Sequence, residues 1–151
     1  MTEPGGSRDA QQKKCQSDRN RPLLQLLNEE QCRTHDIIEC HLKAFLAGKK
    51  PKLLHMLVQG QGGTGKMVLI NTISETFLYY DCKELLAITA TSGVAASLIS
   101  GQTLHSFGGI PIHPGKGDDW YSKASKDTVK KRKRNIEGKQ YLEVDECSMM
   151  T

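Results

Sequence analysis

Eight residues in the middle of the chain have the composition and spacing of a phosphate-binding loop. Residues 60–67 read Gly-Gln-Gly-Gly-Thr-Gly-Lys-Met, which satisfies the pattern G-x-x-x-x-G-K. Glycines let the backbone approach a polyphosphate and aim successive N–H groups at it, and a following helix adds its positive end. Lysine at the end of the pattern reaches the β and γ phosphates. We therefore predict nucleotide contacts along the loop, from Gly60, Gly62, Gly63, Thr64, Gly65, Lys66 and Met67.

The residue after the lysine is unusual for such a loop, because Met67 stands where Ser or Thr is expected. The hydroxyl at this position normally binds Mg²⁺, which prefers oxygen ligands in near-octahedral geometry. A thioether is a poor magnesium ligand. Since phosphoryl transfer depends on positioning and charge stabilisation, we expect nucleotide binding with weakened hydrolysis. The alternative is that a water molecule replaces the hydroxyl.

An acidic pair near the end of the sequence supplies the second part of a nucleotide site. Asp145 and Glu146 follow the short run 141–144. We expect Asp145 to hold Mg²⁺ and Glu146 to act as general base for the attacking water. Glu143 interrupts the run, and a carboxylate in a strand covered on both faces would be desolvated. Either Glu143 pairs with Lys139 or another cation, or this strand is frayed.

Alternating apolar runs and helical patterns predict the elements that must position these residues. An amphipathic helix is expected over residues 23–48, with Asn28 as its N-cap. Further along, we predict strands at 53–58, 85–90 and 141–144, helices at 66–79 and 94–100, and a turn at Thr91-Ser92-Gly93. This alternation indicates an α/β fold with a parallel sheet and ligands at the carboxyl ends of its strands.

Length and composition bound the domain organisation. The 151 residues have room for one domain and a tail, since domains commonly contain about 100–150 residues. Residues 1–22 are polar and basic with almost no apolar side chain, which predicts a disordered tail. Residues 23–151 then form one partial domain, in which we expect 110–138 to be a surface insertion with one helical stretch.

The net charge of +4 permits contact with a polyanion but does not demand it. Five consecutive basic residues, Lys-Lys-Arg-Lys-Arg, occupy positions 130–134. Three interpretations of this run remain open: a nuclear localisation patch, a phosphate-contacting surface, or an ordinary solvated surface.

Cysteine usage and hydropathy limit the class of protein. Five cysteines, an odd number without a C-x-x-C pair, indicate a reducing compartment rather than a disulfide framework. The potential zinc ligands Cys32, His35, Cys40 and His41 fit no paired-knuckle spacing, so we interpret them as ordinary helix residues. We see no signal sequence and no apolar stretch of about 18 residues, so the expectation is an intracellular protein without contact to a membrane.

Three segments of the sequence resemble, in order and spacing, the petite-integration-frequency family of DNA helicases, which includes the helicases of Helitron transposons. They are 60–66, then 90–96 together with 101–107, and finally 145–150. In addition, Asn28-Glu29-Glu30-Gln31 is similar to the adenine-recognition motif of that family. The resemblance extends from about Leu27 to Met150, and its middle segment is the most distinctive part.

The resemblance implies a RecA-like P-loop nucleotide hydrolase domain that uses ATP and Mg²⁺ to move 5′ to 3′ along single-stranded DNA. It implies that Lys66, Asp145 and Glu146 are catalytic, that Gln31 binds adenine and that Asp145 binds the metal. A DNA track is implied at Thr91, Ser92, Gly93, Thr103, His105 and Phe107, where a Phe ring can stack on a base and hydroxyls can hold phosphates. For His105 and Phe107 the alternative is a packed loop corner.

The family has two RecA-like domains with ATP between them, whereas this sequence stops shortly after the strand that carries Asp145. We therefore expect a first domain truncated after the Walker B strand, with the second RecA-like domain missing. Three functions remain open: part of an ATP-dependent helicase, a module that binds ATP or single-stranded DNA without turnover, and a decayed transposon remnant. Roles in the nucleus, in DNA repair and in recombination are also implied by the resemblance.

Overall fold

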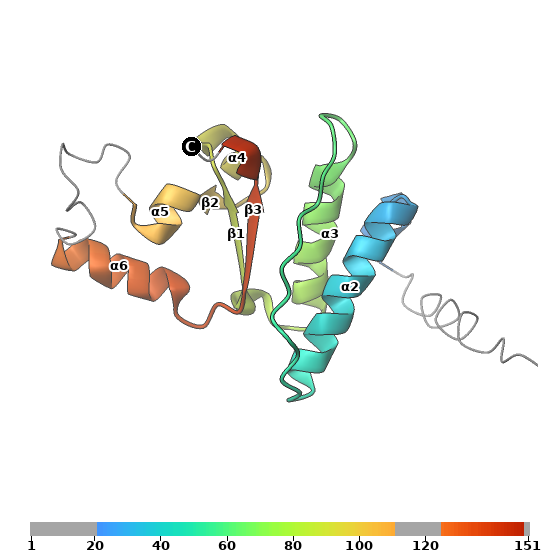
Figure 1. The fold of residues 1–151 in the computed structure, drawn as a ribbon, viewed down its shortest axis with the longest axis horizontal. Coiled ribbons are helices and arrows are strands. Elements are labelled where there is room, and N and C mark those ends of the chain that lie inside the picture. The colour runs from blue at the N-terminus through green and yellow to red at the C-terminus, as the bar shows by residue number, and fades with distance from the viewer. Residues whose placement is uncertain (1–20, 111–124, 150–151) are drawn as a thin grey trace, which may run out of the picture. The chain divides into compact units, whose positions relative to one another are not determined.

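The computed structural model describes residues 21–110 and 125–149 (Figure 1). The chain divides into two compact units, one up to Ile73 and one from Ser74, and the division lies within a helix. The predicted disordered tail at 1–22 lies outside the described residues except for its last two positions. Residues 111–124 of the predicted surface insertion also lie outside them.

The first unit begins with a short 3-10 helix, η1 (Pro22–Leu26), followed by the α-helix α2 (Glu29–Leu46). The sequence predicted one helix over this stretch, but Asn28 interrupts it with extended backbone and becomes the N-cap of α2, as expected. After its last turn, α2 is followed by Gly48, whose φ of 72° lies in the left-handed region that glycine adopts without strain. The predicted cap and helix end are therefore confirmed.

The predicted strand at residues 53–58 is wrong, because residues 49–61 contain no regular secondary structure. Several of its apolar side chains are exposed, with Leu53 82% and Leu57 67% accessible. A strand exists only where a neighbouring strand completes its backbone hydrogen bonds. The described residues of the first unit provide no such neighbour, so the apolar run forms no ladder.

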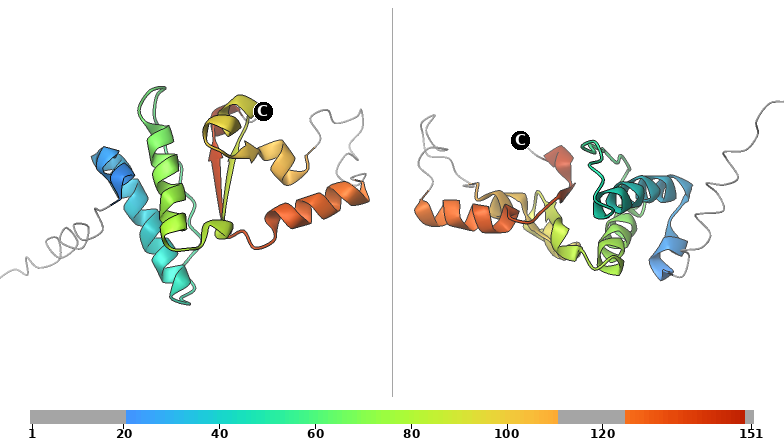
Figure 2. Two further views of the ribbon diagram at one scale, coloured as in Figure 1. Left: turned by 180° about the vertical axis from the view of Figure 1, so that it is seen from behind. Right: turned by 90° about the horizontal axis from the view of Figure 1, so that it is seen from below.

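The helix α3 (Lys66–Tyr79) has the bounds that the sequence predicted. Its first half belongs to the first unit, where it lies beside α2 (Figures 1 and 2) and buries Leu69, Ile70 and Ile73. Its second half belongs to the second unit, where the ring of Phe77 meets that of Tyr141 edge to face at a centroid distance of 4.9 Å. One helix thus contributes to the core of both units.

The second unit alternates strands and helices, which confirms the predicted α/β class. After η2 (Lys83–Leu85), the elements are β1 (Leu86–Ala90), α4 (Gly93–Leu98), β2 (Gln102–Thr103), α5 (Leu104–Gly108), α6 (Lys126–Ile136), β3 (Tyr141–Asp145) and η3 (Cys147–Met149). Thus β1, α4 and β3 agree with the predicted elements to within about two residues. The short strand β2 was not predicted, and α6 is the helical stretch expected in the insertion.

The three strands form a parallel sheet in the order β2-β1-β3. Ala90 at the end of β1 pairs with Thr103 on one side and with Asp145 on the other. The carboxyl ends of the three strands therefore meet at one edge. Gly101 allows the chain just before β2 to approach β1 closely, because a Cβ there would lie 2.6 Å from the carbonyl oxygen of Ile88. In an open parallel sheet this edge is where ligands bind.

Candidate nucleotide and nucleic-acid site

The loop before α3 has the backbone geometry of a phosphate cradle. Gly63 and Gly65 have φ values of 81° and 82°, a region that side chains other than glycine rarely adopt. Thr64 closes the turn, since its Oγ1 donates a hydrogen bond of 2.8 Å to the carbonyl oxygen of Gln61. A Cβ on Gly62 or Gly63 would meet nothing within 4 Å, so this side of the loop is open. The loop therefore fits a polyphosphate.

Lys66 lies over the loop that it follows. Its Nζ donates to the carbonyl oxygens of Gly60 at 2.6 Å and of Gln61 at 3.0 Å. The ammonium is thus held near the backbone by neutral acceptors that a phosphate can replace with charge-assisted hydrogen bonds. Met67, one residue further on, is 42% exposed and offers only a thioether sulfur. The residue that should ligate Mg²⁺ from the loop therefore does not fit that ion.

Gln31 joins the start of α2 to the phosphate loop. Its Oε1 accepts a 3.0 Å hydrogen bond from the backbone N–H of Asn28, which completes a capping box. Its Nε2 donates a 3.0 Å hydrogen bond to the carbonyl oxygen of Thr64. Gly65 is also close, because a Cβ there would lie 3.2 Å from the same nitrogen. The residue predicted to bind adenine therefore lies against the loop predicted to bind the phosphates.

We expect the change Asn28→Ala to lower the free energy of unfolding by about 1 kcal/mol, the usual loss for an N-cap side chain. Without the cap the first turn of α2 frays and Gln31 leaves the loop, so the affinity for the nucleotide predicted to bind there should fall as well. Urea titration and ATP titration measure the two effects. Asn28→Asp keeps a capping oxygen and should remain close to the unchanged chain; an unaltered urea midpoint for Asn28→Ala would contradict the role of the cap.

The acidic pair lies in the second unit, at the carboxyl end of β3. Glu146 has a φ of 57°, which is uncommon for a residue other than glycine. Three hydrogen bonds hold it: its N–H donates to Asp145 Oδ1 at 2.9 Å, and its carbonyl oxygen accepts from Thr91 Oγ1 at 3.1 Å and from Met149 N at 2.9 Å. Strained backbone of this kind costs about 1–3 kcal/mol and clusters at functional sites. The hydroxyl of Thr91 therefore helps to hold the predicted general base.

Glu143 lies on β3 and does not form the predicted ion pair. Lys139 Nζ instead donates a 3.1 Å hydrogen bond to the backbone oxygen of Leu86. The Oε2 atom of Glu143 is buried and has no hydrogen-bond partner among the described residues. Burial, followed by the negative charge of Asp145, raises the pKa of the Glu143 carboxyl to about 7. The strand is nevertheless paired along its length with β1, so the alternative of a frayed strand is also wrong.

Two hydroxyls of the predicted DNA track serve as helix caps. Ser92 Oγ accepts a 3.2 Å hydrogen bond from Ala95 N at the start of α4. Thr103 Oγ1 accepts a 3.2 Å hydrogen bond from Ser106 N at the start of α5. Both side chains thus have a local structural function that their position immediately before a helix explains. Gly93, the first residue of α4, is exposed.

His105 and Phe107 on α5 differ in exposure. The side chain of His105 is exposed, whereas Phe107 is 6% exposed and belongs to the core of the second unit. The expectation that the Phe107 ring stacks on a base is therefore not supported, and the packed loop corner describes this residue. Asn135 of α6 contributes to the packing, since its Nδ2 donates to the carbonyl oxygen of Phe107 at 3.1 Å.

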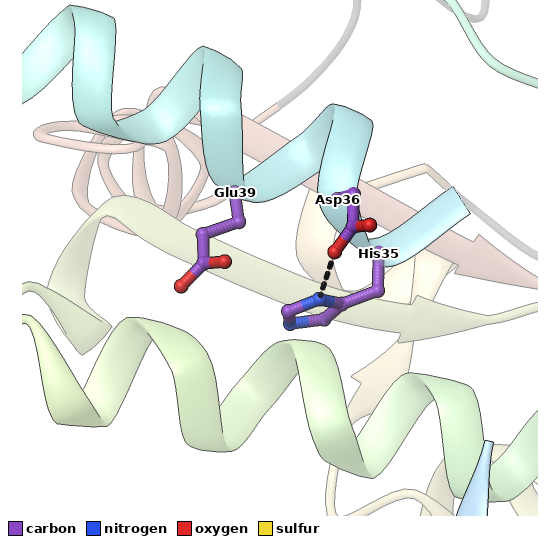
Figure 3. Close-up of side chains that lie close together, drawn as sticks. All are labelled: His35, Asp36 and Glu39. Carbon is purple, nitrogen blue, oxygen red and sulfur yellow. Dashed lines mark ion pairs between the residues drawn. The ribbon is translucent and has the colours of Figure 1, made fainter. Parts of the chain in front are cut away.

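A buried charged cluster on α2 was not predicted. His35 and Glu39 project from the same side of the helix, with Asp36 beside the imidazole at 3.7 Å (Figure 3). Arg21 Nη2 contacts Glu39 Oε1 at 2.7 Å, which neutralises the carboxylate. Burial lowers the pKa of His35 below its ordinary value, against the opposing influence of Glu39. The spacing of four residues between His35 and Glu39 was the available signal.

The three side chains of this cluster could in principle hold a metal ion, because their ligand atoms lie within 4.8 Å of one another. The guanidinium of Arg21 already satisfies Glu39 and repels a second cation. We therefore assign the cluster to the stability of the first unit. The four potential zinc ligands predicted to be ordinary helix residues, Cys32, His35, Cys40 and His41, all lie on α2.

The predicted site residues fall into two groups. Gln31 and the phosphate loop meet in the first unit, while the acidic pair and the predicted DNA-track residues share one edge of the sheet in the second. A surface hollow of about 580 Å³ over β1 contains none of them; its lining includes Lys83, Ile88 and Lys139. Among residues 21–110 and 125–149, no helix combines the length and apolar character that crossing a bilayer requires.

Comparison with known proteins identifies relatives. Residues 26–151 match the family model described as PIF1-like helicase. The chain is 37% identical over 91 residues to ATP-dependent DNA helicase PIF1 of Saccharomyces cerevisiae, which covers 60% of this chain and 10% of that protein. It is 38% identical over 97 residues to ATP-dependent DNA helicase Pif1 of Bdellovibrio bacteriovorus, covering 64% of this chain and 20% of the relative.

A third relative matches a longer stretch. ATP-dependent DNA helicase PIF5 of Trypanosoma brucei brucei is 31% identical over 140 residues, which covers 89% of this chain and 13% of that protein. The chain thus spans a fifth or less of the length of these three relatives. Comparison with the solved structures gives no match. The family model covers far more than half of the sequence, and the parallel α/β unit agrees with a RecA-like helicase domain; the chain belongs to the PIF1-like helicase family.

Proposed function

We propose that this chain is the ATP-binding part of an ATP-dependent DNA helicase that moves 5′ to 3′ along single-stranded DNA. The observation that carries the proposal is the phosphate loop, in which Gly63 and Gly65 adopt left-handed backbone and Lys66 lies over the loop carbonyls. The hydrogen bond from Gln31 to the same loop also supports the proposal, because a residue that binds adenine must lie near the site that binds the phosphates. The relatives are named ATP-dependent DNA helicases, which supports the choice of DNA as substrate.

Each residue has a role in this proposal. The backbone N–H groups of the loop and the ammonium of Lys66 bind the phosphates, while the amide of Gln31 contacts adenine. Asp145 is the carboxylate that would hold Mg²⁺, which neutralises phosphate charge when bound. Glu146, held by Thr91 and Asp145, would orient and deprotonate the attacking water. The proposed phosphate-binding residues belong to the first unit and the acidic pair belongs to the second.

The DNA contacts in this proposal lie at the carboxyl edge of the sheet. We assign them to Thr91, Ser92, Gly93, Thr103 and His105, with Phe107 supporting α5 from the core. Because Ser92 and Thr103 use their hydroxyls as caps, their contribution to DNA would come through the backbone they position. Neutral backbone contacts hold phosphates without reading bases, which suits movement along any sequence.

A second candidate function is a module that binds ATP without turnover. The specific observation in its favour is Met67, which offers sulfur where the loop should offer a magnesium-binding hydroxyl. The two functions share the loop and differ only in catalysis. Roles in the nucleus, in repair and in recombination would follow from the helicase assignment, and the location of a fluorescently tagged chain tests the first of them.

One experiment separates these candidates. The purified chain is titrated with a fluorescent ATP analogue in Mg²⁺, and phosphate release from ATP is then followed with and without single-stranded oligothymidine. Binding with DNA-stimulated release supports the helicase assignment. Binding without release supports the module, and the absence of binding contradicts both.

The change Lys66→Ala should weaken ATP binding at least about tenfold, because a charge-assisted hydrogen bond contributes about 1.5–3 kcal/mol. Lys50→Ala is the matched control, since Lys50 is an exposed lysine of the same unit outside the loop. The titration with the fluorescent analogue measures both variants. Equal losses in the two variants would show that general charge, not the loop, attracts the nucleotide.

A further inference from the structure

The positive charge of the chain is concentrated on one helix. Within α6 (Lys126–Ile136) there are six basic residues and one acidic residue, a net formal charge of +5, whereas the whole chain carries +4. The five lysine and arginine side chains other than Arg132 are exposed: Lys126, Lys130, Lys131, Lys133 and Arg134. Charges this close repel one another, which destabilises the helix. A bound polyanion would reduce this repulsion.

One face of α6 is fixed to α5 by hydrogen bonds. Arg132 donates from Nε to the carbonyl oxygen of Gly108 at 2.8 Å and from Nη2 to that of Gly109 at 3.3 Å. Asn135 donates from Nδ2 to the carbonyl oxygens of Ser106 at 3.3 Å and Phe107 at 3.1 Å. These bonds satisfy the last carbonyls of α5, which a short helix leaves open. The basic run is therefore part of a docked helix and not of a loose surface loop.

The docked face and the charged face are opposite. Thr128, Arg132 and Asn135 follow helical spacing, and all three are half-buried. Lys126, Lys130, Lys133 and Arg134 also follow helical spacing, half a turn away from that face. Figures 1 and 2 show the short helix α5 lying next to part of α6. No acidic side chain in the described parts of the chain forms an ion pair with these four residues.

The neighbours of the charged face favour a nucleic acid over a membrane. A helix that lies on a membrane needs a broad apolar face opposite its charges. The face of α6 opposite its charges is polar and already covered by α5. Lys126, Lys130, Lys133 and Arg134 lie on the face of α6 that points away from α5, where they form an exposed basic surface. A surface with this charge and no apolar residues among its cations matches the phosphates of a nucleic acid.

We propose that α6 is a phosphate-binding helix, in which Lys126, Lys130, Lys133 and Arg134 contact the phosphates of single-stranded DNA. The inference rests on the proposed function for the identity of the polyanion. Lysines and arginines on one helix face neutralise phosphates without reading sequence, and each contact releases counterions from the DNA. Arg132 and Asn135 are positioning residues in this arrangement, because they hold the helix on α5 and do not face the strand.

The test compares two variants with the same loss of charge. The first replaces Lys126, Lys130, Lys133 and Arg134 with Gln, which keeps helix propensity. The second, as a control, replaces the exposed residues Lys49, Lys50, Lys52 and Lys83 with Gln. Fluorescence anisotropy of labelled oligothymidine is measured at several salt concentrations, with circular dichroism to confirm that both variants are folded.

We expect the α6 variant to bind DNA more weakly and to lose about 3 from the slope of log affinity against log salt, since each single-strand phosphate contact contributes about 0.7. The control should keep the slope of the unchanged chain. Equal slopes in the two variants would overturn the inference, as would tighter binding of the unchanged chain to phosphatidylserine vesicles than to DNA.

ATP binding by the same three proteins separates the inference from the proposed function. An α6 variant that binds ATP normally but has the reduced salt slope supports both. If the unchanged chain binds ATP and DNA and the α6 variant has an unaltered slope, only the inference fails. If the unchanged chain binds neither ligand, the proposed function fails together with it.

Discussion

The change Glu143→Gln should make the chain more stable by about 3 kcal/mol above pH 7, while leaving its stability almost unchanged near pH 4. The carboxyl of Glu143 has a pKa of about 7 in the folded chain, against an ordinary value of 4.5. Each pKa unit corresponds to about 1.4 kcal/mol, so the ionised group opposes folding by an amount of that order. The physical cause is the buried Oε2, which has neither a cation nor a hydrogen-bond donor among the described residues.

The direction of the pH dependence follows from the raised pKa. Between pH 4.5 and about 7 the folded chain binds more protons than the unfolded chain, so the free energy of unfolding falls as the pH rises through this window. Below the window both states are protonated at this residue, and above it both are ionised. Urea titrations at a series of pH values measure the profile for the unchanged chain and for Glu143→Gln.

Glu137→Gln is the matched control for this experiment, because Glu137 is an exposed carboxylate close to β3 in the sequence. It should leave the pH profile as it is. Glu143→Leu, which removes the polar group entirely, should remain stable across the whole range. A profile for Glu143→Gln that still falls between pH 4.5 and 7 would show that another group causes the loss.

The change Met67→Thr should increase Mg²⁺-dependent phosphate release roughly a hundredfold, the order of effect that one oriented contact to a transition state commonly has. Threonine restores the oxygen ligand that the loop lacks, and Met67 is 42% exposed, so its removal leaves no large cavity. The same ligand should make ATP binding in Mg²⁺ about tenfold tighter than in EDTA, a ratio that does not depend on turnover.

Met67→Leu is the control for this change, since it replaces the thioether with another apolar side chain of similar volume. It should keep the low rate and the weak dependence on Mg²⁺ of the unchanged chain. If Met67→Thr leaves both quantities at that level, water already replaces the missing ligand, or Asp145 does not reach the ion. A high rate of phosphate release by the unchanged chain would show that Met67 does not impair hydrolysis.

Local signals in the sequence predicted the helices and the glycine loop well. α3 begins at Lys66, where the loop requires a helix, and α2 begins after Asn28, whose side chain and that of Gln31 form a capping box. Both features depend on residues three or four positions apart. Strand β1 was also predicted, because a run such as Leu86–Ala90 between turn residues has few alternatives.

Features that depend on distant residues were not predictable. The run 53–58 is apolar, but whether it pairs depends on a neighbouring strand that the sequence does not identify. Lys139 was expected to meet Glu143, yet the backbone oxygen of Leu86 is its acceptor. Phe107 was a candidate for base stacking because a motif does not reveal which side of a short helix is buried. The hydrogen bonds between α6 and α5 also join residues far apart in sequence.

The amide of Gln31 has four hydrogen-bonding positions, of which the loop and the helix cap each use one. One N–H and one lone pair of the oxygen remain. The N–H of Asn28 must face the oxygen and the carbonyl of Thr64 must face the nitrogen, so the amide has only one orientation that avoids repulsion. If Gln31 contacts the base as proposed, the remaining N–H would suit the acceptor N7 of adenine and the remaining lone pair its amino group, whereas guanine presents two acceptors at the same edge. The capping box of α2 would then favour adenine over guanine at this side chain.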